Sequence, residues 1–352
     1  MRLIRPASLF AFLLVALLLA GCGEKPAYKQ QSYVFGTLVE ISIQGEDEDK
    51  AKRVAAQVLK DFDELHRTLH AWEPGTLERI NGILAHAEPG KPARAALPPG
   101  LIPIIEDATR FAVQSEHLFN PAIGNLVRLW GFHADNYEPD IPPGGEIERL
   151  VQARPRMTDI RIDGLMFEGG NPAVRIDLGG YAKGYALDLA AAYLRGQGVK
   201  NALVNIGGNI MALGRHGDRP WRVGIQHPRR AGAIATLDLR DGEAIGTSGD
   251  YQRYFLVDET RYCHLIDPRT GWPVQGVQAV TVLTRGDKAG VLSDVASKPL
   301  FIAGAAGWRD MARRMGIGQA LFIAGDGRVR VTAPLASRLN WEDNGATPTV
   351  VP

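Results

Sequence analysis

The stretch Ala173–Asp188, A-V-R-I-D-L-G-G-Y-A-K-G-Y-A-L-D, contains three local patterns in succession. β-Branched residues at 174 and 176 predict a short strand ending at Asp177, two glycines follow, and the run from Tyr181 to Arg195 predicts a helix. Backbone N–H groups at such a turn can converge on a phosphate, and Asp177 and Lys183 would add a carboxylate and a cation. The alternative is an ordinary strand–turn–helix connection, because one glycine-rich turn is a weak signal.

The composition is that of a globular protein. Of its 352 residues, 45% are hydrophobic and 22% are charged, which permits a sizeable core. The formal net charge of +1 gives no electrostatic case for binding nucleic acid. Helical and strand patterns are mixed without a regular β–α alternation, so we expect an α+β fold rather than a doubly wound sheet.

The N-terminal segment has the features of an export signal. Two arginines among the first five residues precede an apolar run over residues 9–20, which is too short for a comfortable transmembrane helix. The sequence L-A-G-C at Leu19–Cys22 resembles the lipobox of bacterial lipoproteins, in which Cys22 carries lipid and begins the mature chain. We therefore expect residues 1–21 to be a signal peptide and residues 22–32 a tether. The protein would then be lipid-anchored to a bacterial membrane and face the periplasm. The alternative is a signal peptide whose cysteine is coincidental.

The chain has two cysteines, Cys22 and Cys263. If Cys22 carries lipid, no disulfide can form within the chain. Cys263 stands next to His264, which could suggest a Cys/His nucleophile. The alternative is a small, half-buried residue on a strand.

Periodicity predicts the main elements. Alternating residues predict a strand over Tyr33–Ile43, and apolar residues at helical spacing predict a helix over Asp47–Trp72. Asp163-Gly164 predicts a hairpin between two short strands. Residues 341–352 have the composition of a loose tail. Further helices are predicted at residues 101–116, 290–303 and 307–315, and further strands at residues 173–177, 202–206, 222–225, 235–239, 252–257, 262–266, 277–283, 320–323 and 328–332.

Three other stretches carry more glycine and polar residues than packing requires. A strand running into two glycines lets backbone approach a ligand, and side chains at i, i+3 and i+4 share one helix face. The alternatives are a tight turn and ordinary helix capping. The stretches are Val204–Leu213 with Gly207-Gly208, Gly246–Tyr254 followed by Tyr262–Thr270, and Leu292–Leu300 with Asp294, Ser297 and Lys298.

Taken in order, these motifs resemble the ApbE family, the bacterial FAD:protein FMN transferases. Each motif is weak alone, but seven occur in the family's order between about Tyr33 and Thr332. The resemblance implies a single T-fold-related α+β catalytic unit over residues 33–340, with mixed sheets and flanking helices. The motifs are Phe35-Gly36-Thr37, Trp72-Glu73-Pro74 with Leu77–Asn81, Phe119–Phe132, Asp177–Gly184, Asn205–Gly208, Thr247–Tyr254 and His264–Gly271.

The resemblance implies an enzyme that binds FAD and uses Mg²⁺ to polarise its pyrophosphate. Such an enzyme transfers FMN through a phosphoester bond to a Thr or Ser hydroxyl of a target protein and releases AMP. The implied acceptors are exported redox proteins or flavin-carrying subunits. Two alternatives stay open: an FAD pyrophosphatase that yields FMN and AMP, and a non-catalytic FAD-binding lipoprotein.

The resemblance also implies roles for single residues. The carbonyl of Gly180 and the carboxylate of Asp294 would bind the metal, with Ser297 as a further hydroxyl ligand. His264, Asp294 and Lys298 would be catalytic; we expect His264 to act as an acid/base or phosphate-contacting group, held by Asp267 or its neighbours. The implied FAD contacts are Phe35, Trp72, Phe119, Asn120, Pro121, Asp177, Lys183, Gly207, Gly208 and Ile266.

Three residues depart from the family's pattern. Phe35 replaces the usual Met and Asn120 the usual Asp. Lys298 stands where a metal-binding Thr is usual, and a protonated ammonium cannot ligate Mg²⁺. One hypothesis is that Lys298 supplies part of the metal's charge and pairs with the pyrophosphate. The other is that Lys298 points away and Ser297 provides the hydroxyl.

Overall fold

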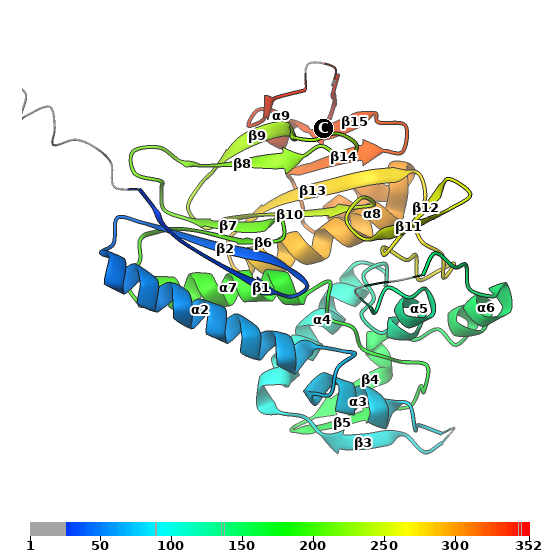
Figure 1. Ribbon diagram of the computed structural model, residues 1–352. Helices are drawn as coiled ribbons and strands as arrows, with labels where there is room; N and C mark the ends of the chain where they lie inside the picture. The colour runs from blue at the N-terminus through cyan, green and yellow to red at the C-terminus, as the bar shows by residue number, and fades with distance from the viewer. Residues whose placement is uncertain (1–25, 89, 135, 137, 344, 346) are drawn as a thin grey trace, which may run out of the picture.

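The computed structural model describes residues 26–352 except 89, 135, 137, 344 and 346, so the predicted signal peptide and Cys22 lie outside the described residues. A nine-stranded sheet organises this part of the chain, in the order β1-β2-β6-β7-β10-β13-β14-β15-β17 (Figure 1). Its strands are β1 (Tyr28–Val34), β2 (Thr37–Gln44), β6 (Asn201–Ile206), β7 (Asn209–Leu213), β10 (Glu243–Gly249), β13 (Val277–Arg285), β14 (Ala320–Ala324), β15 (Val329–Thr332) and β17 (Thr349–Val351).

Three smaller sheets flank the large one. The first joins β3 (Ala93–Ala96), β5 (Met166–Gly169) and β4 (Ile160–Asp163). The second joins β16 (Asn340–Trp341), β9 (Ala233–Leu239) and β8 (Trp221–Gln226), and the third is the hairpin of β11 (Tyr254–Val257) and β12 (Thr260–Cys263). The mixed sheets with flanking helices confirm the α+β prediction.

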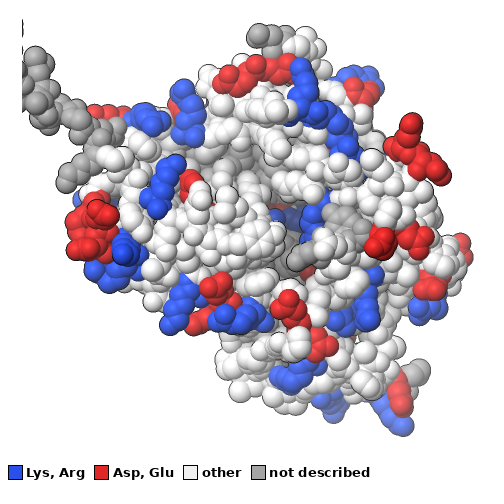
Figure 2. Space-filling view, in the orientation of Figure 1, with Lys and Arg blue, Asp and Glu red and all other residues white. Residues whose placement is uncertain are grey.

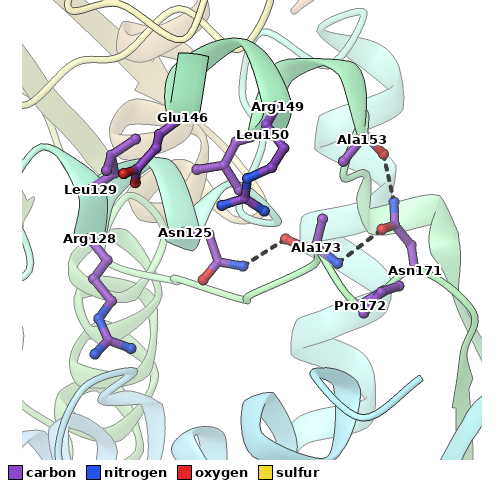
Figure 3. A pocket seen from close by; sticks show the side chains of 10 residues that line it. All are labelled: Asn125, Arg128, Leu129, Glu146, Arg149, Leu150, Ala153, Asn171, Pro172 and Ala173. Carbon is purple, nitrogen blue, oxygen red and sulfur yellow. Dashed lines mark hydrogen bonds between the residues drawn. The ribbon is translucent and has the colours of Figure 1, made fainter. Parts of the chain in front are cut away.

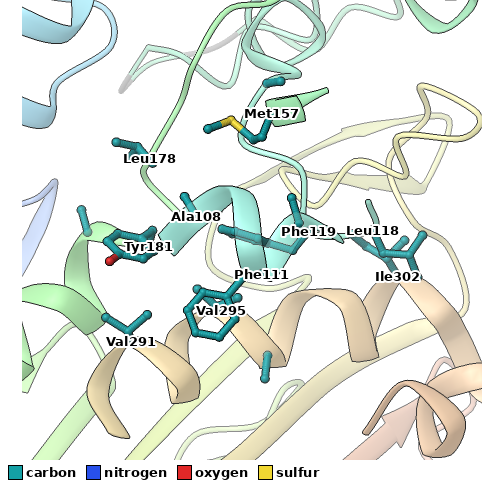
Figure 4. Close-up of a cluster of buried hydrophobic side chains, with 14 of the residues drawn as sticks. Ala108, Phe111, Leu118, Phe119, Met157, Leu178, Tyr181, Val291, Val295 and Ile302 are labelled. Carbon is teal, nitrogen blue, oxygen red and sulfur yellow. The ribbon is translucent and has the colours of Figure 1, made fainter. Parts of the chain in front are cut away.

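Helices α2 (Glu48–Leu69) and α7 (Ala182–Gly196) lie below the sheet in Figure 1, and β8 and β9 lie above it. Helix α8 (Ala289–Arg314) packs on β10 and β13. A hydrophobic cluster joins α8 to α7 and α4, with Phe111, Phe119, Tyr181 and Val295 among its members (Figure 4). The remaining helices are α3 (Thr76–Leu84), α4 (Ile102–Gln114), α5 (Gly124–Leu129), α6 (Gly144–Gln152), α9 (Ala333–Ala336) and the 3₁₀ turns Pro99–Leu101 and Met157–Asp159.

Helix α2 follows from its sequence. Its buried residues recur every three or four positions, and the Asp47 carboxylate caps its first turn by accepting from the Lys50 N–H at 2.9 Å. Among the described residues, no helix combines the length and the apolar character that a bilayer crossing requires.

The single strand predicted over residues 33–43 is instead the β1–β2 hairpin. Phe35 and Gly36 form its two-residue turn with φ of 56° and 67°, the left-handed conformation that matches the twist of paired strands. Because β1 begins at Tyr28, residues 28–32 belong to the sheet rather than to the predicted tether.

The predicted strand over residues 173–177 is also wrong. The segment is extended, but its backbone is satisfied by a loop and a side chain: the Arg175 N–H donates to the Ala122 carbonyl and the Asp177 N–H to the Pro121 carbonyl. The side-chain amide of Asn81 bonds both the N–H and the carbonyl of Ile176. With these partners the segment joins no sheet ladder beyond one isolated bridge.

The C-terminal end is not the loose tail that its composition suggested. Trp341 pairs with β9 through β16, and Thr349–Val351 adds a parallel strand beside β15. The predicted break between helices at residues 303 and 307 is confirmed, because Gly304 inside α8 has φ of 67° and interrupts the helical conformation.

Candidate functional site

Two glycines bring α7 and α8 into backbone contact. A Cβ on Gly184 would lie 2.4 Å from the Gly290 carbonyl oxygen, so only glycine permits this approach. The Gly184 N–H donates to Asp294 Oδ2 at 2.9 Å, and Asp188 accepts from the first N–H groups of α8, those of Gly290 and Val291, at 2.8 Å. Burial raises the pKa of Asp188 to about 6. Helix α7 therefore fixes the position of Asp294. Sequence reasoning missed the part of Asp188, which accepts hydrogen bonds from the first turn of α8.

Lys298 turns into the site. Its Nζ donates to Asp294 Oδ1 at 2.6 Å and to the Asp294 carbonyl at 2.7 Å, because helical side chains lean towards the N-terminus and reach position i−4. A Cβ on Gly180 would lie 2.8 Å from Lys298 Cε, so the aliphatic chain lies against Gly180. The hypothesis that Lys298 points away is wrong.

The residues expected to hold Mg²⁺ do not fit that ion. Lys298 separates Gly180 from Asp294, and both carboxylate oxygens of Asp294 already accept hydrogen bonds. The Ser297 hydroxyl is buried and bonds the Ser248 hydroxyl at 2.8 Å and the Asp294 carbonyl at 2.9 Å. Elsewhere in the described residues, no group of three or more His, Cys, Asp or Glu side chains could hold a metal.

Lys183, Arg253 and Lys298 form what we call the cation cluster. Burial lowers the pKa of Lys183, and the charges of Lys298 and Arg253 lower it further while Asp294 opposes them. Arg253 is held by a bond from Nη2 to the Phe132 carbonyl at 2.5 Å. Figure 2 shows a face of the molecule that is hollowed near its centre, with Lys or Arg atoms within the hollow. Sequence reasoning missed Arg253, although the Thr247–Tyr254 motif contained it.

His264 lies beside the cation cluster as a neutral imidazole. Its Nδ1 is 3.2 Å from the Arg253 carbonyl, which can only accept, so Nδ1 carries the proton and Nε2 presents a lone pair. Burial, helped by the charges of Arg253, Lys183 and Lys298, lowers the pKa of His264 to about 3. Asp267 does not hold His264 as expected, because its carboxylate pairs with Arg269 at 2.7 Å.

The Gly179-Gly180 turn is closed by its own groups. Asp177 Oδ1 accepts the Gly179 N–H at 2.8 Å, and the Tyr181 N–H donates to the Leu178 carbonyl. Burial raises the pKa of Asp177. Two N–H groups of the turn are therefore already bonded within it, which favours a structural turn over a phosphate seat.

Trp72, His133 and Arg175 form a second group, the aromatic cluster. The Arg175 guanidinium lies 4.6 Å from the centre of the Trp72 ring, and the rings of Trp72 and His133 are 5.4 Å apart. His133 Nδ1 and Arg175 Nε are buried without a hydrogen-bond partner. Burial lowers the pKa of both side chains, and the charge of Arg128 adds to the effect. Unpaired buried polar atoms beside an aromatic face are typical of a ligand subsite.

The other predicted FAD contacts have structural partners. Phe119 is buried and would be 3.5 Å from a Cβ on Gly180, whereas Ile266 lies in a separate core cluster with Trp130. Asn120 bonds the Ala122 N–H and the Pro155 carbonyl. Among the other predicted contacts, the Pro121 carbonyl accepts the Asp177 N–H, and Phe35 packs against Phe62 and His66. Gly207 lies against Thr37, and the Gly208 N–H donates to the Asn205 side chain.

A cavity of about 680 Å³ lies between α5, α6 and residues 171–173, away from the predicted site residues (Figure 3). Its amides are largely satisfied: Asn125 donates to the Ala173 carbonyl, and Asn171 bonds the Ala153 carbonyl and the Ala173 N–H, each at 3.0 Å. These bonds stiffen the segment that leads to Arg175.

Comparisons with known proteins identify the family. The ApbE family profile matches residues 35–322. The chain is 41% identical over 320 residues to the FAD:protein FMN transferase of Rhodobacter capsulatus, covering 91% of this chain but only 60% of that relative's length. It is 32% identical to the FAD:protein FMN transferase of Vibrio cholerae, covering 82% of this chain and 85% of that relative.

Solved structures give the same result. The ApbE protein of Thermotoga maritima superimposes with a TM-score of 0.79 at 29% identity, covering 89% of this chain and 99% of that one. The flavinyl transferase ApbE of Pseudomonas stutzeri gives 0.72 at 27% identity, covering 85% and 91%. The chain belongs to the ApbE family.

Proposed function

We propose that the protein transfers FMN from FAD to a Thr or Ser hydroxyl of target proteins through a phosphoester bond, releasing AMP. One observation carries this proposal: a neutral His264 with a free Nε2 lies beside Lys183, Arg253 and Lys298. The names of the ApbE relatives support the same activity.

The chemistry requires a base and positive charge. The acceptor hydroxyl oxygen attacks the FMN phosphorus, the P–O bond to AMP breaks, and the hydroxyl proton passes to His264 Nε2. The cation cluster stabilises the negative charge on the phosphate oxygens. Bound pyrophosphate offsets the field of these cations, which raises the pKa of His264 towards the range useful for a base.

The aromatic cluster would bind a ring of FAD. Trp72 offers a stacking face, and the unpaired Arg175 Nε and His133 Nδ1 offer polar contacts to the ring's edge. Mg²⁺ has no step in this proposal, because Lys298 stands between its expected ligands.

The acceptors we propose are exported redox proteins or flavin-carrying subunits, reached by an enzyme lipid-anchored through Cys22 and facing the periplasm. The lipobox-like Leu19–Cys22 supports this location. Metabolic labelling with a radioactive fatty acid should label the wild type and leave Cys22→Ser unlabelled and released from the membrane fraction. Equal labelling of both proteins would contradict the anchor.

A single assay tests the transferase. Purified protein is incubated with FAD, with and without an exported flavoprotein subunit from the same organism as acceptor. Covalent flavin on the acceptor is the expected result. Release of AMP without an acceptor would identify a pyrophosphatase instead, and bound FAD without any product would identify a binding protein.

A further inference from the structure

A buried ion pair occupies the centre of the cation cluster. The side chain of Asp294 is 1% exposed and that of Lys298 is 17% exposed, and their charged atoms are 2.6 Å apart. The second oxygen of Asp294 accepts the Gly184 N–H, so its carboxylate is fully engaged by the protein. A buried carboxylate of this kind is stable only with a permanent partner, and here the partner is an ammonium on the next helical turn.

We propose that Lys298 is the built-in cation of this site, and that the protein binds the pyrophosphate of FAD there without a divalent metal. This inference rests on the proposed function only in taking FAD as the ligand. Lys298 then does two things: it neutralises Asp294 and presents its remaining N–H to a phosphate oxygen.

The steric fit between Gly180 and Lys298 supports this role. A Cβ at position 180 would lie 2.8 Å from Lys298 Cε and 2.9 Å from its Cδ, closer than side chains pack. Gly180 is therefore the residue that lets the lysine lie across the turn. Its contribution to the site is the space it leaves rather than a carbonyl ligand.

The charges around Lys298 point the same way. The charges of Lys183, Arg253 and Lys298 all lower the pKa of His264, so the three cations surround the same group. A divalent cation on Asp294 would have to displace the ammonium and would then be repelled by three nearby positive charges. The Ser297 hydroxyl is already bonded to Ser248 and to the Asp294 backbone.

The test measures FAD binding to the purified protein by flavin fluorescence, in EDTA and in Mg²⁺. For the wild type we expect the same Kd, within about twofold, in both solutions. Lys298→Met keeps the unbranched shape of the side chain but removes the charge, and should weaken metal-free binding by about 10-fold or more. Lys298→Thr should free Asp294 Oδ1 and make FAD binding tighter in Mg²⁺ than in EDTA. Lys60→Met, on the exposed face of α2, is the control and should bind as the wild type does.

Removing Lys298 alone leaves Asp294 buried and unpaired, so folding is checked by circular dichroism. If Lys298→Met fails to fold, the double variant Asp294→Asn/Lys298→Met removes both charges and should show the same loss of metal-free binding.

The outcomes separate the two proposals. Wild-type binding that tightens 10-fold or more in Mg²⁺, or a charge-free variant that binds normally in EDTA, overturns the role of Lys298 and leaves the transferase proposal standing. Metal-free FAD binding without flavin transfer supports Lys298 and contradicts the transferase. No FAD binding in either solution contradicts both.

Discussion

The cation cluster and the aromatic cluster differ in how their polar atoms are satisfied. Near Lys298, the Asp294 carboxylate and the Ser297 hydroxyl both have hydrogen-bond partners within the protein in the absence of a ligand. Around Trp72, the buried Arg175 Nε and His133 Nδ1 have none. One end of the site is therefore held rigid by the protein itself, and the other has polar groups that a ligand must satisfy.

This difference assigns different work to the two ends. A preorganised charged end costs no rearrangement when negative charge develops, which is the requirement for phosphoryl transfer. At the aromatic cluster, burying Arg175 Nε and His133 Nδ1 without partners costs free energy. A ligand that bonds these atoms removes that cost, which favours tight binding of the ring. We therefore expect changes at the cation cluster and His264 to reduce turnover, and changes at the aromatic cluster to reduce affinity.

The largest expected effect is on turnover. His264→Ala should lower kcat for flavin transfer by about 10²–10⁴-fold, because it removes the proposed base, with the Kd for FAD changed only a few-fold. Single-turnover incorporation of flavin and FAD titration measure the two quantities. The matched control is Cys263→Ala, which should keep its activity. Cys263 is fully buried, and burial raises the pKa of its thiol to about 12, which disfavours Cys263 as a nucleophile. Full activity in His264→Ala would reject His264 as the base.

Next in size is an effect on affinity. Arg175→Met removes the cation over Trp72 and the unpaired Nε, and should raise the Kd for FAD by about 10–100-fold with little change in kcat at saturation. Arg128→Met is the control, since Arg128 influences the same pKa values but is exposed and its charge reaches the cluster only at a distance. An equal loss in both variants would mean that general positive charge, and not ring recognition, sets the affinity.

A smaller effect is expected on stability. Gly184→Ala places a Cβ 2.4 Å from the Gly290 carbonyl and should cost about 1–3 kcal/mol of unfolding free energy. Gly196→Ala, at the exposed end of the same helix with no atom within 4 Å of its Cβ position, should be neutral or slightly stabilising. Urea denaturation compares the two. Similar costs for both would show that the α7–α8 contact is not as tight as described.

The last expected effect is a pH dependence of stability. The pKa of His264 is about 3 in the folded protein and ordinarily 6.5, so between these values the unfolded chain binds a proton that the folded chain does not. The stability that neutral His264 permits is present above pH 6.5 and is lost as the pH falls towards 3. His264→Gln should flatten this loss in thermal melts of the ligand-free protein. An unchanged pH profile would mean that folding does not lower the pKa of His264.

Local sequence patterns predicted the elements that depend on near neighbours. The apolar spacing of α2, the hairpin at Asp163-Gly164 and the break near Gly304 all arise within a few residues of chain. Patterns failed where the partners are distant in sequence. Residues 173–177 look like a strand but take their hydrogen bonds from Asn81 and the loop at Pro121.

The same limit applies to the site. The motifs contained Asp177, Lys183 and His264, and the stretch Leu292–Leu300 contained Asp294. They did not indicate the role of Asp188 as a cap for α8 or that of Arg253 as support for His264. Asp267 was expected to hold His264 and instead pairs with its near neighbour Arg269. His264 and Arg269 both lie within three residues of Asp267, so closeness in sequence does not decide between them. The Arg269 guanidinium donates to both Asp267 oxygens, from Nε and from Nη2, which an imidazole cannot do.

By itself, the sequence determined the family, the order of its motifs, the α+β class and the presence of a lysine where a hydroxyl is usual. Only the tertiary structure decided where that lysine points. Helix geometry carries Lys298 back to Asp294, and the absence of a Cβ on Gly180 leaves it room. The contact of Gly184 with Gly290 brings two segments together that are 106 positions apart in sequence. Such contacts depend on distances set by packing, which no local pattern contains.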